Sequence, residues 1–128
     1  MATRTITRIY PTTDDIHRGS VRILGATGLT NATTDVTDVI GPDAYSGYTE
    51  RTVQVVGTFG TGGTLLIEGS IDGTNYSTLN DPQGNALSVQ VAKIETIMEA
   101  TPYLRARVSA GDGGTDLAVY FFLRQNRL

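Results

Sequence analysis

Apolar and polar residues alternate with a period of two in several short stretches of this chain. Such alternation places every second side chain on one face of a β-strand, so each stretch predicts a half-buried strand. The clearest case is 103–109, whose alternate residues Leu104, Ala106 and Val108 share one face. Shorter predicted strands occupy residues 21–26, 75–79 and 87–91. The pattern favours a chain built mainly of strands.

The stretch 52–76 predicts two strands joined by a glycine-rich turn at 61–63. On the first strand, one parity holds Val53, Val55 and Phe59. On the second, one parity holds Leu65, Ile67 and Ile71. Glycine adopts positive φ without steric cost, which tight turns require, and Asp72-Gly73 is a second turn signal. We expect this pair to form the central hairpin of an antiparallel sheet.

The last predicted strand, 116–124, is apolar on both faces. One face carries Leu117, Val119, Phe121 and Leu123, and the other carries Ala118, Tyr120 and Phe122. The outer face of a two-layer sandwich normally meets water, whereas a strand that is apolar on both faces is covered on both. Something should therefore cover Tyr120 and Phe122, either a loop, the N-terminal segment or another subunit.

Three segments are less regular. Residues 35–40 have helical spacing of their apolar side chains, but their β-branched content favours a strand. Residues 94–98 fit a helical turn or a bulged strand, and 28–34 has the composition of a loop. With about seven to nine short strands and turn signals between them, residues 21–128 predict one all-β domain, an antiparallel β-sandwich or jelly roll.

Residues 1–20 predict an extended N-terminal arm that lies on a neighbouring subunit. Apolar side chains at Ile6, Ile9 and Tyr10 and polar ones at Arg4 and Arg8 provide contacts of both kinds. Solvated tails seldom carry three large apolar groups so close together. An edge strand and a frayed terminus are the alternatives.

Composition narrows the classes of function. The net charge of −3 gives no basic field for nucleic acid, and no apolar run is long enough to span a membrane. The N-terminus lacks the apolar region of a signal peptide, so we expect synthesis in the cytoplasm. Without cysteine, the chain has no disulfides or thiolate metal sites. Nine arginines stand against one lysine, a bias typical of interfaces and equally of arginine-rich codon usage.

No set of residues predicts catalysis. The acidic pairs Asp14-Asp15 and Glu95 with Glu99 have the pattern of surface charges, and His17 is the only histidine. The glycine-rich stretch at 57–63 lacks the lysine of a phosphate-binding loop and precedes a strand. We expect no enzyme activity and no cofactor.

Two binding chemistries have candidate residues. Oxygen donors for calcium stand near turns at Asp72, Asn75, Asp81, Asp112 and Asp116, although turn capping explains these residues equally simply. We therefore predict no metal. Sugar binding would use exposed rings at Tyr45, Tyr48 and Tyr76, which instead are expected to pack at strand ends.

The stretches GTFGTGGTLLIEGSIDGTNYSTLNDPQGNAL and IETIMEATPYLRARVSAGDGGTDLAVYF together resemble small β-rich structural proteins of tailed bacteriophages. The matching elements are GS-x-DG-xx-Y, L-x-D-x-x-G, YLR and AGDGGTDLAV, which cover roughly residues 52–122. The resemblance implies a virion component, a decoration or cement protein on the capsid surface. Such a protein would be a homotrimer that clamps the major capsid protein.

Together these expectations place the subunit or capsid interface at Arg4, Ile6, Arg8, Ile9, Tyr10, Tyr120 and Phe122. Two other functions remain open at this stage. One is a carbohydrate-binding or receptor-binding module of a phage particle, and the other is a head–tail connector or tail component.

Overall fold

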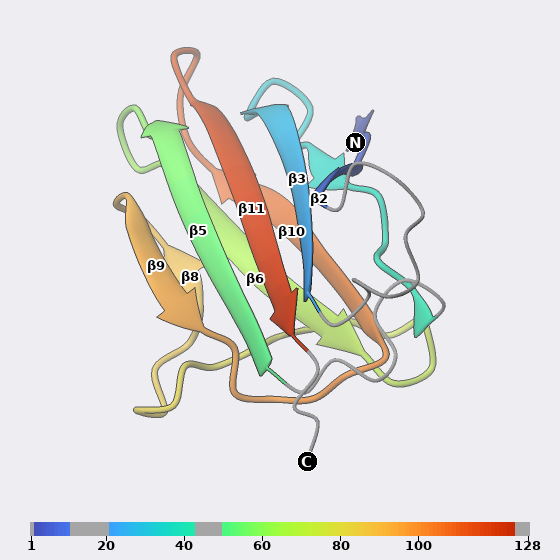
Figure 1. Cartoon of the computed structure of the whole chain (residues 1–128). Coiled ribbons are helices and arrows are strands. Elements are labelled where there is room, and N and C mark those ends of the chain that lie inside the picture. The colour runs from blue at the N-terminus through green and yellow to red at the C-terminus, as the bar shows by residue number, and fades with distance from the viewer. Residues whose placement is uncertain (1, 11–20, 43–49, 125–128) are drawn as a thin grey trace.

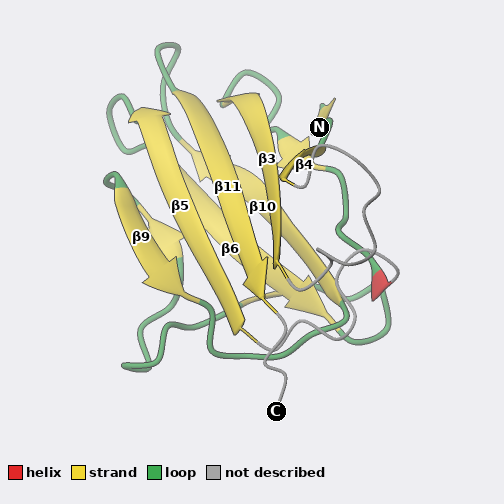
Figure 2. Ribbon diagram, viewed as in Figure 1, coloured by secondary structure: helices red, strands yellow, loops and turns green. Residues whose placement is uncertain are grey.

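The computed structural model describes residues 2–10, 21–42 and 50–124, and these form two β-sheets packed face to face (Figure 1). Strands and the loops between them make up nearly all of the described chain (Figure 2). The all-β antiparallel sandwich predicted from the alternation is therefore confirmed.

Within the described residues, one sheet has six strands. They are β1 (Thr3–Arg4), β4 (Val36–Thr37), β10 (Tyr103–Ala110), β6 (Thr64–Ser70) and β7 (Ser77–Thr78), in that order, with β8 (Ser88–Val89) also paired to β6. The second sheet has five strands in the order β2 (Thr7–Tyr10), β3 (Val21–Thr30), β11 (Asp116–Arg124), β5 (Glu50–Thr58) and β9 (Lys93–Thr96). Neighbouring strands are antiparallel except β1 and β4, which run parallel.

The core lies between the two sheets. On β10 the predicted face of Leu104, Ala106 and Val108 is fully buried. It packs in one cluster with the inward face of β11, formed by Leu117, Val119, Phe121 and Leu123. Burial of each large aliphatic or aromatic side chain is worth about 1.5–3 kcal/mol, so this double layer of side chains stabilises the sandwich.

The predicted central hairpin is wrong. Strands β5 and β6 do not pair, because β5 belongs to the five-stranded sheet and β6 to the six-stranded one. The glycine-rich turn between them crosses from one layer to the other, as does the turn between β10 and β11. These two turns are bonded to each other, since Thr115 Oγ1 donates to the Phe59 carbonyl at 2.7 Å and the Thr61 amide donates to Asp112 at 2.7 Å.

The alternate residues predicted to share a buried face in that stretch are mostly buried, although the two strands do not pair with each other. Val53 and Val55 point inward from one sheet, and Leu65 and Ile67 point inward from the other. Ile71 is an exception, because it follows the end of β6 and its side chain is 75% exposed. A hairpin and a crossing between layers bury the same alternate residues, so the pattern alone does not distinguish them.

Strand β3 is longer than predicted and continues to Thr30 through the expected loop. The register against β11 shifts between Leu117 and Val119, opposite a bulge at Thr27-Gly28. Gly28 has φ of +72°, a conformation that glycine adopts without strain. After this bulge the strand resumes and buries Leu29 completely.

Two segments close opposite edges of the sandwich. Residues 2–10 pair with β4 in one sheet as β1 and with β3 in the other as β2. At the other edge, residues 88–96 also pair with both sheets, because β8 pairs with β6 in one sheet and β9 pairs with β5 in the other. Thus Thr7–Tyr10 is an edge strand, one of the alternatives for the N-terminal segment, while residues 11–20 lie outside the described part of the chain.

Asp35 holds the first strand in place. Its buried carboxylate accepts hydrogen bonds from the Thr30 amide at 3.0 Å and the Thr33 hydroxyl at 2.7 Å, and it pairs with Arg4 Nη2 at 2.7 Å. Burial by itself raises the pKa of Asp35, but these hydrogen bonds outweigh burial and lower the pKa to about 2. The charged form of Asp35 therefore stabilises the fold.

We expect Asp35→Asn to lower the free energy of unfolding by about 2 kcal/mol at neutral pH, the equivalent of the pKa shift. A lowered pKa gives stability that is present above the unfolded pKa and is lost as the pH falls through about 2. The gap between wild type and variant should therefore close between about pH 4 and pH 2 in urea unfolding. Asp116→Asn, at an exposed carboxylate, is the matched control and should change stability by less than about 0.5 kcal/mol. A gap of constant size down to pH 2 would contradict this role.

Candidate functional site

The outer face of the five-stranded sheet is free of charged side chains at its centre. Residues directly opposite each other in antiparallel strands share a face, so the register defines rows across the sheet. One row is Thr7, Gly25, Tyr120, Gln54 and Ile94, and the next is Tyr10, Ile23, Phe122, Thr52 and Thr96. Ala118 and Val56 continue the surface beyond Tyr120. We call these two rows, with Ala118, Val56 and Ile9, the uncharged face.

Several large apolar side chains on this face meet solvent. Phe122 is 36% exposed, Tyr10 41%, Ile9 43% and Ile94 60%. Among the described residues, the charges on this face lie at its two ends, where Arg124 of β11 pairs with Glu50 of β5 and where exposed Asp116 begins β11. An apolar, uncharged centre with charged residues at its margin is typical of a protein–protein interface.

Gly25 shapes the middle of the uncharged face. A Cβ atom at this position would lie 2.6 Å from Tyr120 Cδ1 and 2.8 Å from Ile9 Cδ1. The Tyr120 ring therefore lies across the strand where a larger residue would stand, and Ile9 of β2 packs beside it. The N-terminal segment was one predicted cover for Tyr120, and Ile9 provides part of that cover.

The structure brings together four of the seven predicted interface residues. Ile9, Tyr10, Tyr120 and Phe122 all belong to the uncharged face. Arg4 instead pairs with Asp35, and Ile6 packs against the core while its amide donates to Asp38. Arg8 stands opposite Leu24, a position that is not in the rows of the uncharged face.

Sequence reasoning missed the part of the face supplied by β5 and β9. Thr52, Gln54 and Val56 alternate with the buried residues of β5, but only the strand register places them beside Tyr120 and Phe122. Ile94 had ambiguous spacing and belongs to edge strand β9. The missing signal was the pairing of β5 with β11, more than 50 residues apart in the sequence.

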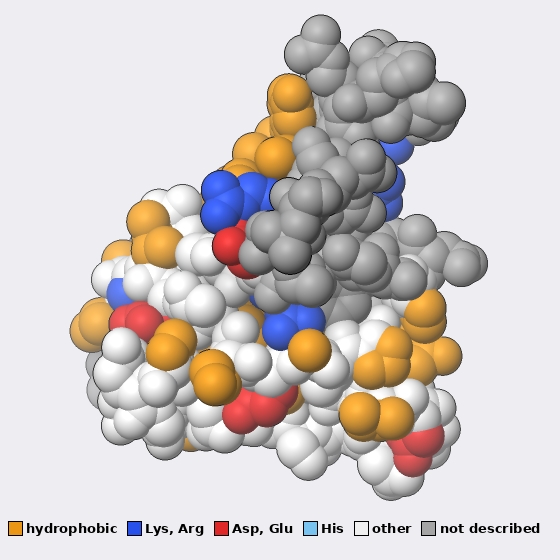
Figure 3. Space-filling view, turned by 60° about the horizontal axis from the view of Figure 1, so that its bottom comes forward, with side chains coloured by type: hydrophobic (Ala, Val, Ile, Leu, Met, Phe, Trp, Pro, Cys, Tyr) orange, Lys and Arg blue, Asp and Glu red, His pale blue; other side chains and the backbone are white. Residues whose placement is uncertain are grey.

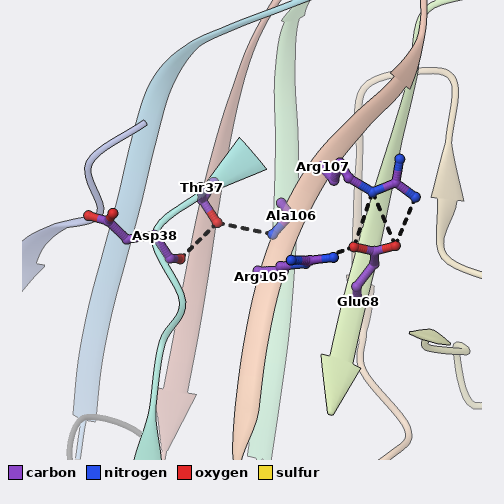
Figure 4. Close-up of polar contacts among 6 residues, drawn as sticks. All are labelled: Thr37, Asp38, Glu68, Arg105, Ala106 and Arg107. Atoms are coloured by element: carbon purple, nitrogen blue, oxygen red, sulfur yellow. Dashed lines mark hydrogen bonds and ion pairs between the residues drawn. The ribbon is translucent and has the colours of Figure 1, made fainter. Parts of the chain in front are cut away.

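The outer face of the six-stranded sheet has a different chemistry. Arg105 and Arg107 on β10 converge on Glu68 of β6 (Figure 4). Burial by itself raises the pKa of Glu68, but the hydrogen bonds and charges of Arg107 and Arg105 outweigh burial and lower it. The Arg105 guanidinium also lies over the ring of Tyr76, 3.9 Å from its centroid.

Figure 3 shows the described residues at the lower end of the sandwich. There, hydrophobic side chains lie in separate spots with polar and charged groups between them. Ile71 and Val39 are also exposed and apolar, but they lie outside the rows of the uncharged face. Among the described surfaces, the uncharged face is the strongest candidate for an interaction site.

Three of the four acidic residues considered for calcium, Asp72, Asp81 and Asp112, cap turns, and Asp116 begins strand β11. Asp72 accepts bonds from the amides of Asn75 and Thr74, both at 2.8 Å, and these bonds lower its pKa. Asp81 accepts from the amides of Gln83 and Asn85, and Asp112 from those of Thr61 and Gly114. Within residues 2–10, 21–42 and 50–124, no group of three or more His, Cys, Asp or Glu side chains is arranged to hold a metal ion.

Two other candidates lie outside the described residues, namely the acidic pair Asp14-Asp15 and the rings of Tyr45 and Tyr48. No helix in the part of the chain that the structure describes has the length and apolar character needed to cross a membrane. Comparison of the chain with models of protein families, with curated proteins and with solved structures gave no match.

We expect Gly25→Val to displace the Tyr120 ring and Ile9, because the new side chain would occupy their space. The unfolding free energy should fall by about 1–3 kcal/mol, the usual cost of overpacking. Hydrogen exchange at the amides of β2 should become faster, since its packing on β3 is disturbed. Gly113→Ala is the control, because a Cβ there meets no atom within 4 Å. Unchanged exchange in β2 would show that Gly25 does not hold this part of the face.

Proposed function

We propose that this protein is a non-enzymatic virion structural protein, a decoration or cement protein that clamps neighbouring major capsid subunits of a tailed bacteriophage. The observation that carries the proposal is the uncharged face, with Phe122, Tyr10, Ile9 and Ile94 exposed on it. The motif resemblance of residues 52–122 to phage structural proteins supplies the particular class of partner. As the resemblance implies, we propose a homotrimer on the outer surface of the capsid.

Burial of the uncharged face would provide the adhesion. Stable interfaces bury about 800 Å² on each partner, and apolar burial contributes about 25 cal/mol per Å² before the cost of association. Aromatic side chains such as those of Phe122 and Tyr10 are enriched at protein–protein interfaces and contribute strongly to binding. The face therefore has the chemistry of a protein clamp.

The edges of the sandwich favour contact through a face over contact through added strands. At one edge the strands are β1 and β2, and at the other they include β8 and β9, each four residues long or shorter. Short edge strands offer little backbone for a partner strand to pair with. A partner is thus expected to lie on the sheet.

The N-terminal segment takes part in the proposed clamp through Ile9 and Tyr10. Because residues 2–10 pair with both sheets of their own chain, deleting them would disturb the fold as well as the clamp. Single side-chain substitutions on the uncharged face are therefore the sharper test.

We expect Phe122→Glu to weaken binding to empty capsids of the same phage by at least about 100-fold, since it buries a charge at the centre of the interface. Co-sedimentation with capsids that lack this protein measures the affinity. Ile71→Glu is the matched control, because it adds the same charge at a more exposed apolar residue outside the uncharged face. Its binding should stay within about twofold of wild type.

Equal binding by Phe122→Glu and wild type, with both folded by circular dichroism, would refute the role of the uncharged face. Failure of the wild type to bind capsids would refute the capsid as partner. Strong and selective signals on a glycan array would instead favour a carbohydrate-binding module, and binding only to tail or connector assemblies would favour a head–tail component.

A further inference from the structure

The second candidate surface lies on the other side of the sandwich, where two arginines share one carboxylate. Arg105 stands directly opposite Glu68 on the neighbouring strand, and Arg107 stands one position further along the same face. Their guanidinium groups approach the Glu68 carboxylate from the β10 side (Figure 4). Two arginines and one glutamate give this cluster one net positive charge, whereas the whole protein has a net charge of −3.

The hydrogen bonds leave several donors of this cluster unused. Arg105 donates from Nε to Glu68 Oε1 at 2.9 Å. Arg107 donates from Nε to both oxygens at 3.3 Å and from Nη2 to Oε2 at 3.0 Å. A guanidinium has five N–H donors. Among the described residues, neither Nη group of Arg105 nor the Nη1 group of Arg107 donates a hydrogen bond, and both side chains are partly exposed.

The position of Arg105 is held from two sides. Its Nε atom is bonded to buried Glu68, and the plane of its guanidinium lies over the Tyr76 ring. Cation–π contact and the ion pair together reduce the freedom of the side chain. Donors that are already oriented lose less entropy when they bind a ligand.

We propose that Arg105 and Arg107 form a carboxylate-binding site that takes an Asp or Glu side chain from an acidic segment of a protein partner. Arginine matches the two oxygens of a carboxylate with parallel N–H donors. Glu68 already fills the inner donors, so the partner carboxylate would occupy the outer ones. The site lies on the opposite sheet from the uncharged face, and the proposal stands independently of the capsid function.

A protein carboxylate fits this surface better than an acidic sugar. Sugars commonly stack on an exposed aromatic ring, but the ring of Tyr76 is covered on one side by Arg105. Next to the arginines the strand surface is extended, with Leu66 opposite Arg107 and Tyr103 opposite Ser70. An extended acidic peptide has room to lie along such a surface while its carboxylate meets the guanidinium groups.

Titration calorimetry with a hexaglutamate peptide at about 0.1 M salt, where distant charges are screened, tests the site. We expect Arg105→Gln and Arg107→Gln each to weaken binding by about tenfold or more, because a charge-assisted bidentate contact is lost. Each single variant leaves Glu68 paired with one arginine, so the fold should persist. Arg124→Gln is the matched control, since it removes the same charge from an exposed ion pair on the other sheet. It should change binding by less than about twofold, the effect of distant screened charge.

Arg107→Lys separates geometry from charge, because lysine keeps the charge without the planar fork. We expect it to bind hexaglutamate more weakly than wild type, and equal binding would overturn the bidentate site. If Arg124→Gln weakened binding equally, the effect would be one of net charge and the proposal would be overturned. Lack of binding by the wild type would also overturn it. Tighter binding of a galacturonate oligomer than of hexaglutamate would assign the site to acidic sugars instead.

Discussion

The packing of one apolar inner face against another is the interaction on which the rest of this structure depends. Leu104, Val108 and Phe121 are fully buried between the sheets, and the other large inner residues are buried with them. Because the inner faces supply most of the core, with Ile40, Leu79, Leu87 and Ile97 added from the connecting segments, the outer faces are not needed to form it. Their side chains can differ in chemistry without loss of the fold, and in this protein they do differ.

The two outer faces are unlike in a way that bears on function. One combines rings, aliphatic chains and threonines and keeps its charges at its ends, the pair of Arg124 and Glu50 at one and Asp116 at the other. The other places Glu68 between Arg105 and Arg107. Apolar burial and charged hydrogen bonds select different partners, since the first depends on shape and the second on geometry and sign. Under the two proposals, this two-layer domain would lie between two surfaces of different chemistry.

The sequence predicted the strands better than their partners. The alternation at 103–109 and 116–124 located β10 and β11 to within one residue, because burial on one face leaves a period of two. The pairing of β5 was not predictable, since a hairpin with β6 and a crossing to the other sheet bury the same side chains. For the same reason, the sequence pattern identified Ile9, Tyr10, Tyr120 and Phe122 only as separate apolar residues. The strand register was needed to show that they share a face with Gln54 and Ile94. The contact of Glu68 with the two arginines joins positions 37 and 39 residues apart and had no local signal.

The uncharged face exists only in the complete fold. Its rows take residues from β2, β3, β11, β5 and β9, so they combine positions from Thr7 to Phe122. A partly folded chain would expose the same side chains without arranging them on one surface. A partner that binds the face therefore binds only the native state, and by mass action it stabilises that state. In the proposed assembly, adhesion and folding would thus be coupled, and an apolar surface that is a liability for the free protein would become a source of stability.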